Sequence, residues 1–387
     1  MLCAKCKGRL LCGRIKCPLL EKFKLLKSVK IDEKELTKPT PPSIFVGRIG
    51  YPNVYIGPMI ALAENNPEFL DSPWLWSGTV DDVIKIRMNL IRGKKRIKVS
   101  DVNSKIVQNL QEVAASIKHV YLETELVKVS RKPIFDDVLQ PIGISAEMGK
   151  IKITENPKIP HKVEKVIDDD LPADDAVKIL FDKGFRTYYI QKLFSVGLLG
   201  KEKRRKLVPT RWSITAVHSI LGEKIKEKLI DFKDANEILV FRYEHFGNKF
   251  TVVISPNGYN FSLIEIWRKR SFWSPDKTWV GYDSEGIKKK NKYSELGGGY
   301  YAARLPVLEY FEQHKIKGSV LVIREITPEY YAPIGVWVVE EGVRKAMMQK
   351  PIKIESKNEF DEIIGKEINF ENVSKFINFR QSTLLDF

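Results

Sequence analysis

The chain has 387 residues, 43% of them hydrophobic, and a formal net charge of +16. Its mean hydropathy of −0.24 and the lack of any apolar run of about 18 residues exclude a membrane-spanning helix. The length suggests two or three domains. No secretion signal is recognisable, so we expect a cytoplasmic protein. The surplus of basic residues favours a polyanionic partner, most simply DNA, although a thermophile's lysine-rich surface would also raise the charge.

All four cysteines lie near the N-terminus, at Cys3, Cys6, Cys12 and Cys17. Four thiolates in so short a segment can close a tetrahedral zinc site, and metal binding would supply folding energy that no local core provides. Disulfides or free thiols are the alternative, but an intracellular chain keeps its thiols reduced. We predict a four-cysteine zinc module at residues 1–20, with Zn2+ as a structural cofactor.

Residues 29–43 are charged and then proline-rich, which predicts a linker. Residues 45–58 place three glycines, two prolines and one arginine among apolar residues. This composition predicts a strand that leads into a tight loop, with Arg48 and Asn53 available for contact. Such a loop is often a binding loop, and a buried structural turn is the alternative.

Two helices are predicted next, one from Thr79 to Gly93 and one over residues 102–118, because apolar residues recur at helical spacing. A basic run that includes Lys94, Lys95 and Arg96 lies between them. It is a candidate nucleic-acid contact.

Residues 119–128 alternate between apolar and polar side chains, which predicts a strand with Glu123 and Glu125 on one face. Paired carboxylates could hold a divalent metal, although a solvated sheet face is the alternative. Residues 155–175 are charged and contain proline, which predicts a linker or an exposed loop.

Helices are predicted at residues 174–183 and 187–195, and a basic run with Lys203, Arg204 and Arg205 follows them. This run is the second candidate nucleic-acid contact.

The next helix is predicted to begin at Thr210 or Ser213 and to run to about Glu227. Arg211 and Trp212 then stand at its N-terminus, which favours anions. Such a pair can hold a phosphate and stack a base, and a tryptophan packed under the arginine stem is the alternative.

Strands at residues 237–243, 249–254 and 259–267, joined by turn residues, predict an antiparallel meander. The loop after them interleaves cations, among them Arg268 and Arg270, with tryptophans. This pattern suits single-stranded nucleic acid, and tryptophans in a core against the sheet are the alternative.

A triple glycine precedes Tyr300 and Arg304 and a predicted helix at residues 305–313. Its backbone could approach a phosphate closely, although no nucleotide-binding glycine fingerprint is present. The elements predict an α+β fold with mixed helices and a largely antiparallel sheet. The remaining ones are strands at 318–325 and 334–339 and a helix at 340–348.

Gln381, Leu384 and Phe387 stand three residues apart. Residues at this spacing eclipse in a 3₁₀ turn, so one turn would present an amide, an aliphatic group and an aromatic ring together. The spacing Q-x-x-L-x-x-F resembles the peptide by which replication and repair proteins dock on the sliding clamp PCNA. A frayed end with two chance apolar residues is the alternative.

Several long segments together resemble the archaeal Nre family of DNA-repair proteins, close to its NreA branch. They are the cysteine segment, FVGRIGYPNVYIGPM, LVPTRWSITAV, GGGYYAARLPVLEY and PIGVWVVEEGVRKAM. The resemblance covers essentially the whole chain. It implies a role in the DNA-damage response and PCNA docking through Gln381, Leu384 and Phe387, and it carries over no catalytic residue set. It also implies two homology regions, placed here at 21–275 and 276–380, with the docking tail at 381–387.

Three functions remain open from the sequence. The first is a DNA-repair factor recruited by PCNA, with a zinc module and a basic nucleic-acid-binding body. The second is an enzyme acting on DNA or a nucleotide in a cleft between the glycine- and arginine-bearing loops, and the third is a non-catalytic adaptor. The candidate catalytic residues are Arg48, Asn53, Arg211, Trp212, Tyr300 and Arg304.

Overall fold

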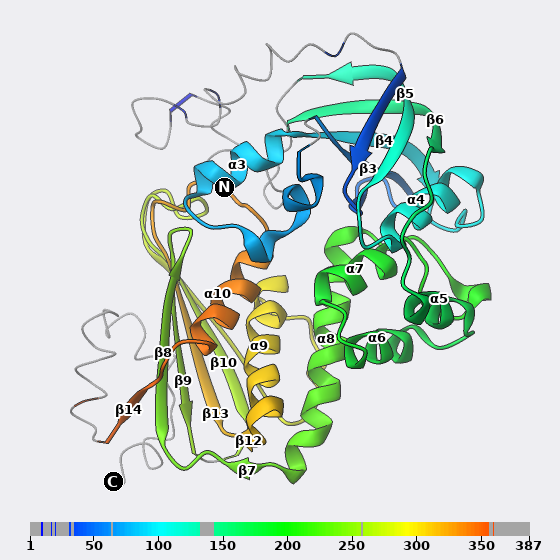
Figure 1. Cartoon of the computed structure of the whole chain (residues 1–387). Coiled ribbons are helices and arrows are strands. Elements are labelled where there is room, and N and C mark those ends of the chain that lie inside the picture. Colours follow the sequence, from blue (N-terminus) through cyan, green and yellow to red (C-terminus); the bar gives the residue numbers. More distant parts are fainter. Residues whose placement is uncertain are drawn as a thin grey trace. The chain divides into compact units, whose positions relative to one another are not determined.

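The structure is a computed structural model, and its described residues form two compact units. Of the described residues, those within 6–77 and 81–221 form the N-terminal unit, and those within 78–80 and 222–359 form the C-terminal unit. Each unit is built on one six-stranded sheet with helices against it (Figure 1), so the predicted α+β class is confirmed. The described residues are 35–62, 65–131, 143–256 and 258–355, with isolated positions 9–10, 17, 20, 31 and 359.

The sheet of the N-terminal unit is mixed. Its strand order is β1 (Glu35–Thr40), β5 (Val120–Ser130), β6 (Ile144–Ile153), β4 (Leu90–Lys98), β3 (Asn53–Ala61) and β2 (Ile44–Val46). Only β4 and β6 run parallel among these neighbours. The helices are α3 (Val80–Met88), α4 (Lys105–Ala115), α5 (His161–Asp168), α6 (Ala173–Asp182), α7 (Thr187–Ser195) and the first turns of α8 (Thr210–Lys228).

One face of this sheet forms the core of the unit. Along β3, Val54 and Ile56 are buried, whereas Asn53 and Tyr55 are exposed. This alternation follows from the strand period of two, and α4 packs its apolar side on the buried face. The opposite face at this end of β3 is therefore open to solvent.

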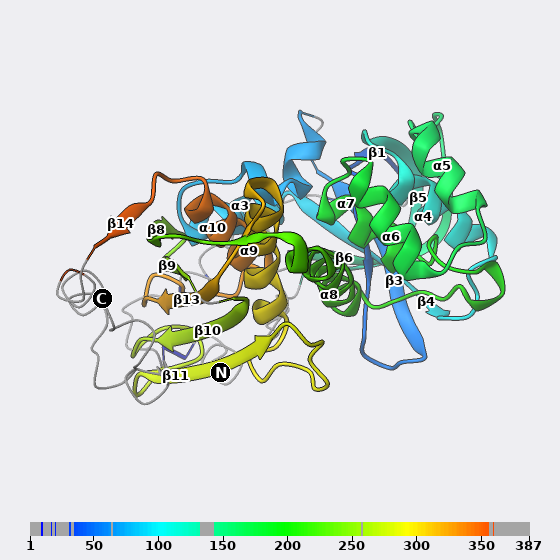
Figure 2. The same ribbon diagram turned by 90° about the horizontal axis from the view of Figure 1, so that it is seen from below.

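The sheet of the C-terminal unit has the order β11 (Trp279–Gly286), β10 (Asn260–Trp267), β13 (Ser319–Ile326), β9 (Asn248–Ser255), β8 (Ile238–His245) and β14 (Ile352–Ile354). A separate parallel pair joins β7 (Lys233–Asp234) to β12 (Ile316–Lys317). Both α9 (Gly298–His314) and α10 (Trp337–Met347) pack on one face of the main sheet, as Figure 2 shows. Aromatic contacts fix α9 there, because Tyr300 meets Phe261 and Tyr310 meets Phe241.

The predicted strands β8, β9 and β10 are confirmed, but the predicted meander is wrong. Strand β13 lies between β9 and β10, antiparallel to β9 and parallel to β10. Five consecutive residues of β13, from Val320 to Arg324, are buried, as expected for a strand in the interior of a sheet. Local turn signals cannot reveal a strand inserted from so far along the chain.

Two segments predicted as linkers contain regular structure. Residues 35–40 form β1, and this edge position tolerates Pro39 because a proline there need not donate to a ladder. Residues 161–168 form α5, whose Val163 and Val166 are buried one helical turn apart. Charge and proline content hid both elements.

Further boundaries differ from the prediction, among them the helix predicted at residues 305–313, which begins at Gly298 and so includes part of the triple glycine. The helix predicted to end at Gly93 ends at Met88, and residues 90–98 form β4. Residues 334–339 do not form a strand, because α10 begins at Trp337. Apolar residues suit either element in such short runs, and tertiary packing decides between them. No helix of the described residues has the length and apolar character needed to cross a bilayer.

Candidate nucleic-acid interface

Three segments that are far apart in the sequence meet in the N-terminal unit. The Val99 N–H donates to the Pro52 carbonyl at 2.9 Å, and the Leu207 N–H donates to the Val99 carbonyl at 2.8 Å. The Val46 N–H donates to the Thr210 hydroxyl at 2.9 Å. These bonds join the β2–β3 loop, the end of β4 and the start of α8.

The β2–β3 loop (residues 47–52) is held by its own backbone. The Gly47 N–H donates to the Tyr55 carbonyl at 2.7 Å, and the Asn53 N–H donates to the Gly50 carbonyl at 2.9 Å. Gly50 has a φ of +83°, and a Cβ there would lie 2.9 Å from the Asn53 oxygen. Only glycine fits this position without strain, so the loop has one defined shape.

Two large aromatic side chains lie together on this surface. Tyr51 is 49% exposed and Trp212 is 46% exposed, and their ring centroids are 5.2 Å apart. Tyr55 is also exposed on the adjoining strand β3. The structure therefore presents the Trp212 ring to solvent, and its ring partner is Tyr51.

The charges around the aromatic pair are all positive along the chain. None of the segments 44–61, 90–100 and 203–222 contains an aspartate or a glutamate. In strand register, Arg96 pairs with Tyr55 and Lys98 with Asn53. We call the following exposed residues the basic–aromatic surface: Arg48, Tyr51, Tyr55, Arg96, Lys98, Arg211 and Trp212.

Nearer the core, the cations of β4 are crowded. The Arg92 guanidinium lies 3.8 Å from the Phe45 ring centroid and is buried. Burial lowers the pKa of Lys94, and the charge of Arg92 lowers it further, while Glu147 opposes this shift. An anion bound near Lys94 would counter the shift, since a negative charge favours the protonated amine. Lys95 is half-buried on the same strand.

The residues of the second predicted basic run, Lys203, Arg204 and Arg205, differ in their surroundings. Lys203 and Arg204 are exposed in a short 3₁₀ helix. Arg205 donates through Nε to the Gly200 carbonyl at 2.8 Å and through Nη2 to the Ile167 carbonyl at 2.5 Å. Arg205 therefore fixes the last turn of α5 and has a structural role.

The aromatic loop after β10 belongs to the C-terminal unit and is more closed. Arg268 forms an ion pair with Glu325 at 2.6 Å, and Trp267 is buried against Trp273. Arg270 is exposed, with a positive φ of 72°. Trp267 thus follows the alternative of a tryptophan in the core.

Glu123 and Glu125 stand on β5, as predicted. The Glu125 carboxylate accepts a hydrogen bond from the Lys150 N–H at 3.0 Å. In the part of the chain that the structure describes, no group of three or more His, Cys, Asp or Glu side chains could hold a metal ion. Of the four predicted zinc ligands only Cys17 is described, with a half-buried free thiol.

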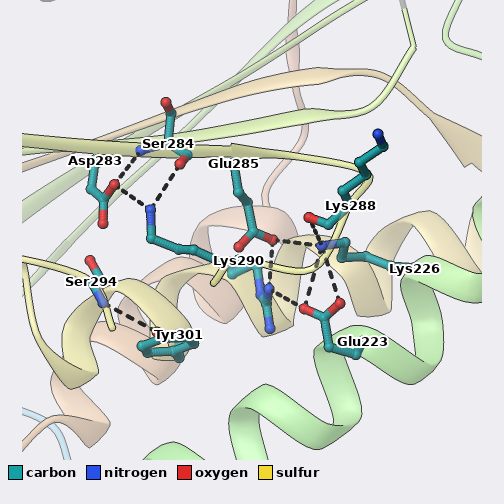
Figure 3. A network of polar contacts seen from close by, with 10 residues as sticks. Glu223, Lys226, Asp283, Ser284, Glu285, Lys288, Lys290, Ser294 and Tyr301 are labelled. Atoms are coloured by element: carbon teal, nitrogen blue, oxygen red, sulfur yellow. Dashed lines mark hydrogen bonds and ion pairs between the residues drawn. The ribbon is translucent and has the colours of Figure 1, made fainter. Parts of the chain in front are cut away.

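Tyr300 and Arg304 lie on α9, buried in the core of the C-terminal unit. Arg304 is 0% exposed and donates to Glu223 at 2.8 Å and to Glu285 at 2.5 Å. Lys226 joins the same two carboxylates, and Figure 3 shows this buried ion network. Burial alone would lower the pKa of Arg304, but Glu285, Tyr259 and Glu223 together outweigh burial, and the net shift of the pKa is upward.

The buried ion network links three elements, with residues from α8, α9 and β11. Tyr300 beside it is fully buried, and burial raises the pKa of its hydroxyl. Neither Tyr300 nor Arg304 reaches solvent. Of the six candidate catalytic residues, the structure therefore brings four together, namely Arg48, Asn53, Arg211 and Trp212.

Sequence reasoning missed three members of the basic–aromatic surface. Tyr51, Tyr55 and Lys98 were not candidates, although the period of two along β4 was a usable signal. Arg96 and Lys98 alternate with the inward-facing Ile97. A basic run that alternates with apolar residues indicates one charged strand face.

Comparisons with known proteins agree with this resemblance. The family model described as "Archaeal Nre, N-terminal" matches residues 11–274, and "Archaeal Nre, C-terminal" matches residues 285–386. The chain therefore belongs to the archaeal Nre family. No solved structure matches it.

Three curated relatives are described as DNA repair proteins. NreA of Archaeoglobus fulgidus is 57% identical over 92% of this chain and 90% of its own length. NreB of the same organism is 36% identical over 100% of this chain and 97% of its own length. NreA of Haloferax volcanii is 35% identical over 79% of this chain and 76% of its own length.

Proposed function

We propose that this protein is a DNA-repair factor that binds DNA through the basic–aromatic surface and is recruited by PCNA. The observation that carries the proposal is its 57% identity, over 92% of the chain, with a relative described as a DNA repair protein. The acid-free segments around Tyr51 and Trp212 support DNA as the ligand, because clustered Lys and Arg side chains neutralise phosphates.

Docking on PCNA is assigned to Gln381, Leu384 and Phe387, which lie outside the described residues. Their spacing supports this assignment, since one short turn would align them for a pocket on a partner. Tethering by such a peptide raises the local concentration of the DNA-binding body at its site.

The experiment that tests recruitment is calorimetric titration of the archaeal clamp with the full chain. We expect Phe387→Ala to weaken binding at least roughly 30-fold, because a buried aromatic anchor contributes about 2 kcal/mol or more. Thr383→Ala is the matched control, since it lies between the anchor positions, and it should bind like the unaltered chain. Equal affinities for Phe387→Ala and Thr383→Ala would refute docking through this segment.

Zinc binding by Cys3, Cys6, Cys12 and Cys17 is part of the proposal. A half-buried thiol such as that of Cys17 is compatible with a thiolate ligand. When bound, the ion would contribute folding free energy to this segment. Zinc analysis of the purified protein should give one ion per chain, and a zinc-free, fully folded protein would contradict this assignment.

The enzyme and adaptor functions remain predictions. Arg48, Asn53, Arg211 and Trp212 meet at a surface rich in cations and aromatic rings, which suits binding of a polyanion. Tyr300 and Arg304 have the solvent exposure of core residues. The geometry therefore favours DNA binding as the use of this surface.

A further inference from the structure

The aromatic pair of the basic–aromatic surface is the least explained feature of the N-terminal unit. Tyr51 and Trp212 leave nearly half of each side chain in water, although both are large enough to be valuable in a core. Their ring centroids lie 5.2 Å apart, and the ring planes are inclined by 50°. This tilted packing leaves part of each ring surface open to solvent. An exposed aromatic cluster of this kind indicates a binding site.

The pair is held in place before any ligand arrives. Tyr51 stands on a loop fixed at Gly50 by a positive φ and at Pro52 by the hydrogen bond from Val99. Trp212 stands in the first turn of α8, where its N–H donates to the Pro209 carbonyl at 2.7 Å. A ligand that stacks here therefore loses little affinity to the ordering of these backbones.

The charges beside the pair identify the class of ligand. Arg211 precedes Trp212 directly, and Arg48 lies three residues before Tyr51, both exposed. Arg96 reaches the loop, since its Nη2 lies 3.6 Å from the position of a Cβ on Gly50. Aromatic rings with cations on several sides match a chain of phosphates that also offers flat, unstacked rings.

We propose that Tyr51 and Trp212 stack unpaired bases, and that the basic–aromatic surface binds single-stranded DNA in preference to duplex. Bases within a duplex are already stacked on one another and present only their edges and backbone to a protein. A single strand can offer base faces to the two rings and phosphates to Arg48 and Arg211. This inference rests on the proposed DNA-binding function and names its substrate class.

The test compares the full chain with Tyr51→Leu and Trp212→Leu by fluorescence anisotropy of labelled DNA. The probes are an oligothymidylate of about 15 nucleotides, near the upper site size of a single-strand-binding fold, and a duplex of equal length. Each substitution should weaken single-strand binding roughly 5- to 150-fold, the equivalent of one stacked base. Duplex binding should change less than about twofold, because the cations that contact phosphates remain.

A matched control separates stacking from a general loss of an exposed ring. Tyr293 is 58% exposed and stacks on Tyr301 at 5.5 Å in the C-terminal unit. Tyr293→Leu should leave binding of both probes unchanged. Thermal denaturation of every variant confirms that it is folded.

The outcomes distinguish this inference from the proposed function. Base stacking would be overturned if Tyr51→Leu and Trp212→Leu both kept the single-strand affinity of the unaltered chain, or if they lost equal affinity for single strand and duplex. DNA binding itself would still stand. If the full chain binds neither probe, the DNA-binding function falls. Tighter binding of oligouridylate than of the thymidylate would make RNA the substrate and overturn the assignment to DNA.

Discussion

The basic–aromatic surface and the buried ion network use similar sequence material for opposite purposes. Both bring a glycine, an arginine and aromatic rings together, but only in the network does the glycine leave room for a guanidinium. A Cβ at Gly50 would crowd the Asn53 carbonyl and make only an ordinary contact with Arg96, whereas a Cβ at Gly222 would overlap Arg304. The difference lies in the carboxylates, because the surface segments contain none and the network contains Glu223 and Glu285.

This difference shows what makes an arginine available to a ligand. Arg304 is separated from Glu223 by 81 residues and from Glu285 by 19 residues, yet both carboxylates engage it. A glycine- and arginine-bearing motif is therefore a binding candidate only when the fold brings no acid to it. The surface meets that condition along its own segments, and the network does not.

The largest expected effect comes from breaking the buried ion network. Arg304→Leu would leave Glu223 and Glu285 with Lys226 as their remaining cation, so we expect the free energy of unfolding to fall by about 3–5 kcal/mol. Urea denaturation followed by circular dichroism measures this. The exposed Arg211→Leu should stay within about 0.5 kcal/mol of the unaltered chain. A loss below roughly 1 kcal/mol for Arg304→Leu would show that the two arginines are energetically alike.

The second effect is the acid sensitivity of the C-terminal unit. Burial, helped by Lys345, lowers the pKa of His245 from 6.5 to about 3. The unfolded chain therefore takes up a proton below pH 6.5 that the folded chain refuses. The folded state loses about 1.4 kcal/mol per pH unit on acidification between 6.5 and about 3, and the loss is complete below the folded pKa.

His245→Phe isolates this contribution. Its unfolding free energy should fall less steeply than that of the unaltered chain between pH 6 and pH 4, by about 2–3 kcal/mol over the interval. His161→Gln, at an exposed position, is the control and should follow the unaltered chain. Parallel pH profiles for His245→Phe and the unaltered chain would show that the imidazole is protonated in the folded protein.

Local patterns predicted much of the fold and only part of the surface. The helices at Lys105–Ala115 and Thr187–Ser195 follow from apolar periodicity within a single element. The place of β13 between β9 and β10 could not be predicted, because it depends on pairing between distant segments. Arg211 and Trp212 are adjacent in the sequence, so local composition was enough to predict them as a candidate site. Their contact with Tyr51 joins distant segments, so it could not be predicted without the structure.

The smallest expected effect concerns the exposed cations of β4. It tests whether cations without a neighbouring carboxylate are the ones that contact DNA. Arg96→Gln and Lys98→Gln should leave the free energy of unfolding within about 0.5 kcal/mol of the unaltered value. Each should reduce the slope of log affinity against log salt concentration by about 0.7–0.9, the value for one lost phosphate contact. Anisotropy titrations of DNA at several salt concentrations measure these slopes.

Lys353→Gln is the matched control, because Lys353 is exposed in the C-terminal unit but already paired with Glu237 at 2.9 Å. A lysine already paired with a carboxylate interacts less favourably with a phosphate. Lys353→Gln should therefore keep the unaltered chain's slope of log affinity against log salt concentration. If Lys353→Gln lowers the slope as much as Lys98→Gln does, DNA contacts cations regardless of their pairing. The acid-free segments would then owe their binding to net charge alone, and the contrast between surface and network would apply to stability but not to recognition.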